Sequence, residues 1–156
     1  MSVYSAIVSN TALNTAADLV TLTPAANRRI QLLEVSIGGM GTASLANELG
    51  VFQVTTVGVT GAGAITPGAW SGDGLAPAAA STVFTGWTTQ PVIGAQLASI
   101  PFNSNGGLYR WKAAPDQPIY AVGLAAATRV NPQLSFRAKV GNGSASIMII
   151  WMEDPL

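Results

Sequence analysis

The feature that most constrains the fold is a series of short segments in which apolar and polar residues alternate, separated by Gly, Pro and Asn. In residues 134–140, Leu134, Phe136, Ala138 and Val140 alternate with polar or charged side chains, which predicts a half-buried strand. Gly141, Asn142 and Gly143 follow and tolerate positive φ, and residues 144–152 are apolar on both faces. We therefore expect a β-hairpin whose second strand is central in a sheet packed on both sides.

Similar segments recur along the chain and predict one all-β domain over residues 1–156, a jelly-roll-like antiparallel β-sandwich of about eight to ten short strands. A phase slip at Leu32-Leu33 predicts a bulge. Little helix is expected: only residues 42–49, with Thr42 as N-cap and Gly50 after the end, favour a short one. Residues 1–17 form either an N-terminal arm or an extra strand. The other expected strands are 4–9, 19–23, 28–37, 50–56, 81–85, 93–99, 108–112 and 119–126.

Residues 58–80 are expected to form a long loop, because they contain six Gly, two Pro and a single charged residue, Asp73. Loops of this length without structure of their own are usually functional or disordered. Disorder would expose Ile65, Trp70 and Leu75 to water, so we expect the loop to order against a neighbouring chain.

Charge is scarce in this chain: only 9% of the residues are charged, against about 25% in ordinary soluble domains. Seven basic and seven acidic residues give a net charge of zero, which does not suit a nucleic-acid partner. No apolar run approaches the ~18 residues of a membrane-spanning helix, and the first ten residues lack the Lys or Arg of a secretory signal. The composition indicates a soluble domain that buries apolar surface against other chains.

Catalysis is not expected. The chain has no His and no Cys, which excludes Ser-His and Cys-His nucleophiles, the usual zinc ligands and disulfides. Nothing in the sequence brings any two of the seven carboxylates together for acid–base chemistry. The glycines Gly58, Gly61 and Gly63 superficially resemble a phosphate loop, but the residues after them cannot start a long helix. We predict no enzymatic activity, no cofactor and no metal.

Aromatic side chains beside polar loops are the candidate contact residues, either as a protein interface or as a platform for stacking on sugars. Trp111 and Trp151 are more simply explained as core residues, and Tyr109 and Trp111 share the strand face opposite Arg110 and Lys112. In the basic pair Arg28-Arg29, one arginine is expected in solvent and the other paired with Glu34 or with a partner chain. The candidate interface residues are Trp70, Trp87, Phe102, Tyr109, Arg110 and Arg28.

Four stretches carry a resemblance to a known group of proteins. They are Arg28-Arg29-Ile30-Gln31-Leu32-Leu33-Glu34-Val35-Ser36-Ile37, Asn47-Glu48-Leu49-Gly50-Val51-Phe52-Gln53-Val54, the run from Pro101-Phe102-Asn103 to Gly106-Gly107-Leu108-Tyr109-Arg110-Trp111, and Pro115-Asp116-Gln117-Pro118-Ile119. Over residues 18–153 the chain resembles small virion proteins of tailed bacteriophages. The resemblance implies a jelly-roll capsid decoration (cement) protein, made in the host cytoplasm and located on the outer capsid surface. Such a protein is usually a homotrimer, binds the major capsid protein, and has no catalytic or cofactor residues.

Two other functions fit the same sequence. One is a trimeric receptor-binding or fibre-tip module that uses Trp70 or Trp87 to stack on a host glycan. The other is a carbohydrate-binding module of a secreted enzyme, against which the lack of a signal peptide counts. Binding to capsids without sugar would favour decoration, whereas saturable glycan binding that is lost on a Trp substitution would favour the alternatives.

Overall fold

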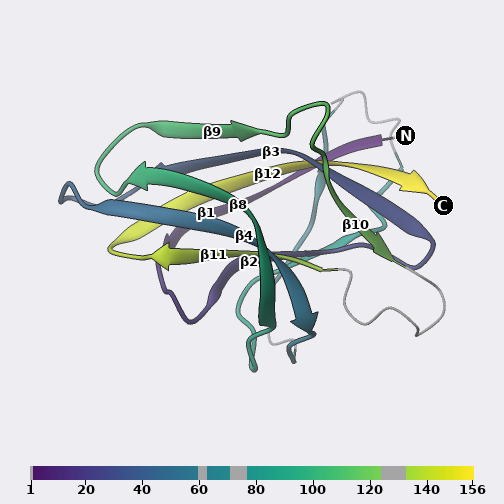
Figure 1. The fold of residues 1–156 in the computed structure, drawn as a ribbon, viewed down its shortest axis with the longest axis horizontal. Helices are drawn as coiled ribbons and strands as arrows, with labels where there is room; N and C mark the ends of the chain where they lie inside the picture. The colour runs from purple at the N-terminus through teal and green to yellow at the C-terminus, as the bar shows by residue number, and fades with distance from the viewer. Residues whose placement is uncertain (1, 60–62, 71–76, 124–132) are drawn as a thin grey trace.

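The computed structural model describes residues 2–59, 63–70, 77–123 and 133–156, and every strand in these ranges belongs to one of two antiparallel sheets (Figure 1). Sheet A has the order β10 (Ile119–Gly123), β3 (Arg28–Gly39), β12 (Ser144–Pro155), β1 (Ser2–Ala12) and β6 (Gly68–Ala69), and β9 (Leu108–Lys112) also pairs with β3. Sheet B has the order β5 (Ala64–Ile65), β7 (Thr82–Phe84), β2 (Asp18–Thr23), β11 (Leu134–Val140), β4 (Ala46–Thr56) and β8 (Val92–Asn103). No helix occurs in the part of the chain that the structure describes.

The chain alternates between the two sheets as it proceeds. Strands β1, β3, β9, β10 and β12 lie in sheet A, while β2, β4, β8 and β11 lie in sheet B. The result is the wrapped connection order of a jelly roll, in which strands from both halves of the sequence interleave within each sheet. The predicted jelly-roll-like antiparallel sandwich is therefore confirmed, and the two-residue strands β5 and β6 are additional to those expected.

The core lies between the sheets and is filled by alternate side chains of the long strands. Phe136 of β11 and Trp151 of β12 are fully buried and come from opposite sheets. Tyr4 of β1 packs beside Trp151, with ring centroids 6.1 Å apart. Burying a side chain of this size contributes about 1.5–3 kcal/mol, so the period-two pattern of the sequence fixes which face of each strand turns inward.

The predicted hairpin at residues 134–152 is wrong, although both of its strands exist. β11 pairs with β2 and β4 in sheet B, while β12 pairs with β1 and β3 in sheet A. The residues between them form a corner that joins the sheets, with Gly143 at φ 83°. Each strand has a buried face that needs a partner layer, and placing them in opposite sheets lets these faces pack against each other.

β12 is central in its sheet, as expected, with β3 and β1 as neighbours. The expectation that it is packed on both sides is wrong, because Met148 and Met152 on its outer face are half-buried. Its pairing with β3 shifts register where Leu32 and Glu34 oppose consecutive residues of β12, leaving Leu33 unpaired. This is the bulge that the phase slip predicted.

The predicted helix at residues 42–49 is also wrong, since residues 46–49 begin the long strand β4. Leu49 is buried opposite Ile100 of β8, and Asn47 holds the corner through hydrogen bonds with the backbone N–H and carbonyl of Asn142. These long-range contacts outweigh the weak local helix signal.

Among the other expected strands, β9 and β11 begin and end where the sequence placed them, and β1, β2, β4 and β8 are longer than expected. β10 ends at Gly123, and the rest of the expected strand 119–126 lies outside the described residues.

The first residues of the chain are part of the sandwich, because β1 pairs with β12 along most of its length. In the 58–80 segment, β5 pairs with β7 and β6 pairs with β1. That segment therefore contacts both sheets of its own chain, while residues 60–62 and 71–76 lie outside the described part.

Candidate interaction surface

The outer face of sheet A carries a run of apolar side chains, which we call the apolar strip: Val3, Ile7, Trp70, Met148, Ile150 and Met152. The pairing of β1 with β12 places Val3 opposite Met152 and Ile7 opposite Met148. Inward-facing Tyr4 and Ala6 are buried, so their neighbours Val3, Ser5 and Ile7 face outward.

Trp70 extends the strip beyond β1. Ala69 of β6 pairs with Tyr4, and the backbone N–H of Trp70 donates to the carbonyl of Val3 over 2.9 Å. Directly opposed residues of an antiparallel pair share one face, so Trp70 stands beside Val3 on the outside of the sheet.

The strip is partly open to solvent. Ile7 is 58% exposed and Trp70 is 54% exposed, Val3, Met148 and Met152 are half-buried, and Ile150 is buried. A one-sided antiparallel sheet normally presents polar residues to water on its outer face. Two methionines among the apolar residues add side chains that adapt readily to a partner's shape.

Charged residues border the strip on the β3 side. Glu34, beside Ile150, accepts hydrogen bonds from Nε of Arg110 at 2.7 Å and from the hydroxyl of Ser36 at 2.9 Å. Lys112 Nζ lies 3.9 Å from the same carboxylate. The hydrogen bonds from the Arg110 guanidinium are the main reason that the pKa of Glu34 is held below its usual range, against the opposing effect of burial.

A second ion pair lies farther along the same face. Arg29 contacts Asp154 at 3.2 Å, and its guanidinium lies over the ring of Tyr120, 5.3 Å from the centroid. An apolar centre with a polar, charged border is the usual layout of a protein interface.

The outer face of sheet B is covered by the chain itself. Thr21 and Phe84 face outward opposite each other, and the indole of Trp87 lies over them, donating from Nε1 to the Thr21 hydroxyl at 3.0 Å. Arg137 pairs with Asp18 at 2.6 Å and donates to the carbonyl of Pro91 at 2.9 Å. Val92 and Val140 of sheet B are exposed, but within the described residues they lie apart and form no continuous strip like that of sheet A.

The predicted contact residues do not lie together in the structure. Trp70 and Arg110 lie on the outer face of sheet A, at opposite sides of it. Tyr109 is also exposed but stands opposite buried Ile37, on the inward side of β9, as the alternation with Arg110 predicted. Arg28 is half-buried at the start of β3.

Three expectations need correction. Trp87 is only 7% exposed and Phe102 only 4%, so both are packed inside the protein instead of on its surface. Trp87 is buried because it covers sheet B, and Phe102 because it faces the core from β8. For the basic pair, the expected contact with Glu34 is wrong, because Arg110 holds Glu34 and Arg29 pairs with Asp154; pairing with a partner chain stays a prediction.

Sequence reasoning missed most of the apolar strip. A signal was present for β12, whose residues 144–152 are apolar on both faces, but this pattern does not indicate which face stays open. Ile7 and Val3 join the strip only because β1 pairs with β12, which local sequence does not reveal.

Comparison with known proteins gives no assignment: no family model, no curated protein and no solved structure matches the chain. Among the described residues there is no group of three or more acidic, His or Cys side chains placed to hold a metal ion. The same residues include no helix that is long and apolar enough to cross a membrane.

Proposed function

We propose that the protein is a non-enzymatic virion component, a capsid decoration protein that attaches as a homotrimer to the major capsid protein on the outside of a phage head. The observation that carries the proposal is the open apolar strip on the outer face of sheet A. Because Trp70 and Ile7 are more than half exposed at its edge, a partner surface would remove them from water.

The low charge of the chain suits this role. A cement protein acts by adding buried area across the seams between capsid subunits, and each buried charge carries a large desolvation cost. With 9% charged residues, and with Glu34, Arg110, Arg29 and Asp154 already paired at the border, the strip can be covered at little electrostatic cost.

A trimer requires two different complementary patches on each subunit. The first half of edge strand β8 offers a second patch, because residues 92–96 include no charged side chain and Val92 is exposed. Edge strands that stay free in solution are usually protected by charges. Three linked subunits would also raise the effective concentration of each remaining capsid contact.

The receptor-binding and carbohydrate-binding alternatives lose one of their two expected stacking residues, since Trp87 is buried. Trp70 remains open, but its neighbours Val3 and Met152 are apolar and supply no hydrogen-bonding side chain for a sugar at that position.

The test is co-sedimentation with expanded heads of the phage whose genome encodes the chain, in the absence of sugar. We expect saturable binding, which Trp70→Ala and Ile7→Lys each weaken by about tenfold or more, since about 1.4 kcal/mol corresponds to a factor of ten. Val140→Lys is the matched control: Val140 is also exposed, but it lies in sheet B, and this variant should bind like the wild type.

Light scattering during gel filtration tests the oligomer separately. A mass three times that of the 15.9 kDa chain is expected over a range of concentrations. Failure of the wild type to bind heads, or full binding by both strip variants, would overturn the proposed role of the sheet A face.

A further inference from the structure

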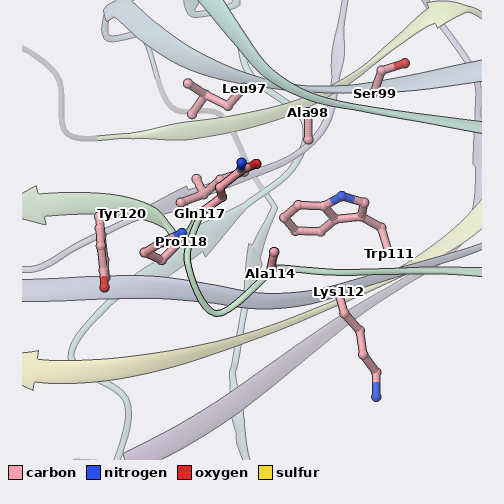
Figure 2. A pocket seen from close by; sticks show the side chains of 10 residues that line it. Leu97, Ala98, Ser99, Trp111, Lys112, Ala114, Gln117, Pro118 and Tyr120 are labelled. Carbon is pink, nitrogen blue, oxygen red and sulfur yellow. The ribbon is translucent and has the colours of Figure 1, made fainter.

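A groove of about 480 Å³ opens on the side of the sandwich, between edge strand β8 of sheet B and the β9–β10 connection beside sheet A (Figure 2). Leu97, Ala98 and Ser99 line it from β8, and Trp111, Gln117 and Pro118 line it from the opposite side. The volume falls in the range of small-molecule sites, roughly 300–1,000 Å³.

The indole of Trp111 is the largest group in the groove. Trp111 faces inward from β9, opposite buried Val35, and is half-buried against the core. In Figure 2 its ring extends across the groove toward Gln117 and Pro118. The buried Trp87 and Trp151 each donate a hydrogen bond from Nε1, whereas Nε1 of the half-buried Trp111 makes none within the described residues and is available to a ligand.

Gln117 supplies the second polar group. Its backbone N–H donates to the carbonyl of Ala114 at 3.0 Å, which fixes the turn that carries it. Its side-chain amide has no hydrogen-bond partner in the described part of the chain and lies on the side of the groove across from Trp111 (Figure 2). Gln117 is exposed, so the groove presents to one ligand an aromatic ring and an amide that is otherwise open to water.

Among the described residues that line the groove, Lys112 alone is charged, and its ammonium points away from the other side chains in Figure 2. The hydroxyl of Ser99 is used elsewhere, as a donor to Glu48 at 2.7 Å. A neutral ligand that combines an apolar surface with hydrogen-bonding groups suits this lining best.

We propose that the groove binds a neutral saccharide, with the C–H face of one pyranose ring stacked on the Trp111 indole. Hydroxyls of the stacked ring would exchange hydrogen bonds with the Gln117 amide, and a hydroxyl of the adjoining sugar unit would accept from the indole Nε1–H, which points outward from the ring edge. The site is distinct from the apolar strip, so this proposal and the capsid-binding proposal fail independently.

An added peptide strand suits the groove less well. Pairing along β8 would need regularly spaced main-chain groups, but the carbonyl of Ala98 already accepts from the Gln96 side chain at 3.1 Å. The register of β8 against β4 also shifts between Val51 and Phe52 and twice more before Thr56, so this part of the edge is irregular.

The test is titration of ¹⁵N-labelled protein with four neutral hexasaccharides: cellohexaose, maltohexaose, chitohexaose and mannohexaose. We expect saturable binding of at least one, with the largest shifts at the Trp111 indole N–H and the Gln117 side-chain NH₂. Gln117→Ala should weaken binding about two- to tenfold, the range for one lost hydrogen bond. Trp111→Phe, which keeps a ring against the core, should weaken it by a similar factor.

Trp70→Ala is the control, because Trp70 lies on the outer face of sheet A and outside the groove. It should leave saccharide binding unchanged, and circular dichroism of each variant checks that the fold is intact. Absence of binding by all four saccharides would overturn the proposal, as would shifts confined to Trp70. So would binding of a peptide with the sequence of residues 92–103 at Leu97 and Ser99 in place of any saccharide.

Discussion

Arg110 and Glu34 form a two-pronged ion pair across the edge of sheet A, with Arg110 Nε 2.7 Å from Oε1 of Glu34 and the terminal nitrogen 2.8 Å from Oε2. The pair joins β9 to β3, next to the apolar strip. Parallel hydrogen bonds of this kind fix orientation as well as contributing energy. The pair therefore holds β9 in place at the border of the proposed capsid contact and beside the groove that contains Trp111.

Acid is expected to weaken this pair. The hydrogen bonds from Arg110 lower the pKa of Glu34 from its ordinary value of 4.5. A carboxyl group with a lowered folded-state pKa stabilises the fold fully above its unfolded-state pKa, and that contribution is lost as the pH falls through the folded value. The free energy of unfolding of the wild type should therefore exceed that of Glu34→Gln near neutral pH, and the difference should shrink below about pH 4.5.

Urea unfolding of both proteins from about pH 7 to about pH 3 measures this difference. Other carboxyl groups, including Glu48, whose pKa is also lowered, titrate equally in both proteins and cancel. A gap between the two proteins that stays constant with pH would show that the ionised form of Glu34 has no special stabilising role.

Glu153 is a buried carboxylate that secures the chain just before β7. It accepts hydrogen bonds from the backbone N–H groups of Ala80 at 3.1 Å and Ser81 at 3.0 Å, and from Nε1 of Trp151 at 3.1 Å. In Glu153→Gln an NH₂ group replaces one oxygen, so at least one of these donors faces another donor. We expect a loss of about 1–3 kcal/mol in the free energy of unfolding.

Asp116→Asn is the matched control for Glu153→Gln, because Asp116 is exposed in a turn and should change stability by less than about 0.5 kcal/mol. Amide exchange gives a second readout: Ala80 and Ser81 should exchange faster in Glu153→Gln. Equal stability of the two variants would mean that the 77–81 segment is held by other contacts, such as the hydrogen bond from the Tyr4 hydroxyl to the carbonyl of Pro77.

Gly123 and Gly68 are a pair of strand glycines with opposite surroundings. A Cβ on Gly123 would collide with the backbone carbonyl of Ala25, whereas a Cβ on Gly68 would meet no atom within 4 Å. Gly123→Ala should therefore lower the free energy of unfolding by about 1–3 kcal/mol, because the β2–β3 connection has to move. Gly68→Ala should be nearly neutral, and thermal unfolding of the two variants checks the contrast.

Local alternation was sufficient to find most strands, since it depends only on which face of a segment is buried. β9, with Tyr109 and Trp111 on one face and Arg110 and Lys112 on the other, and the bulge at Leu33 were both predictable in this way. Which strands are neighbours in each sheet was not predictable in this way. The corner at Gly141–Gly143 has the residues of a hairpin turn, and only the long-range pairing of β11 and β12 distinguishes the two structures.

The candidate interaction surface was also only partly predictable, because exposure depends on the pairing of the strands. Trp70 was expected to be exposed because it lies in a segment without periodic core positions, and it is exposed. Trp87 lies in a similar Gly- and Thr-rich context but is buried, because that segment crosses the outside of sheet B, where the Thr21 hydroxyl accepts its N–H. Composition around a tryptophan does not reveal which sheet it covers, so the two could not be distinguished before the topology was known.

The four tryptophans make the sheet A face observable by fluorescence. Trp70 is 54% exposed, Trp111 is half-buried, and Trp87 and Trp151 are buried. Acrylamide should therefore quench Trp70 most strongly, so Trp70→Phe should lower the quenching slope, whereas Trp87→Phe should leave it nearly unchanged. If the strip meets the capsid and not another copy of the chain, quenching of the wild type should stay constant with protein concentration and fall when expanded heads are added. A fall with protein concentration alone would instead place the strip in the contact between subunits and contradict its assignment to the capsid.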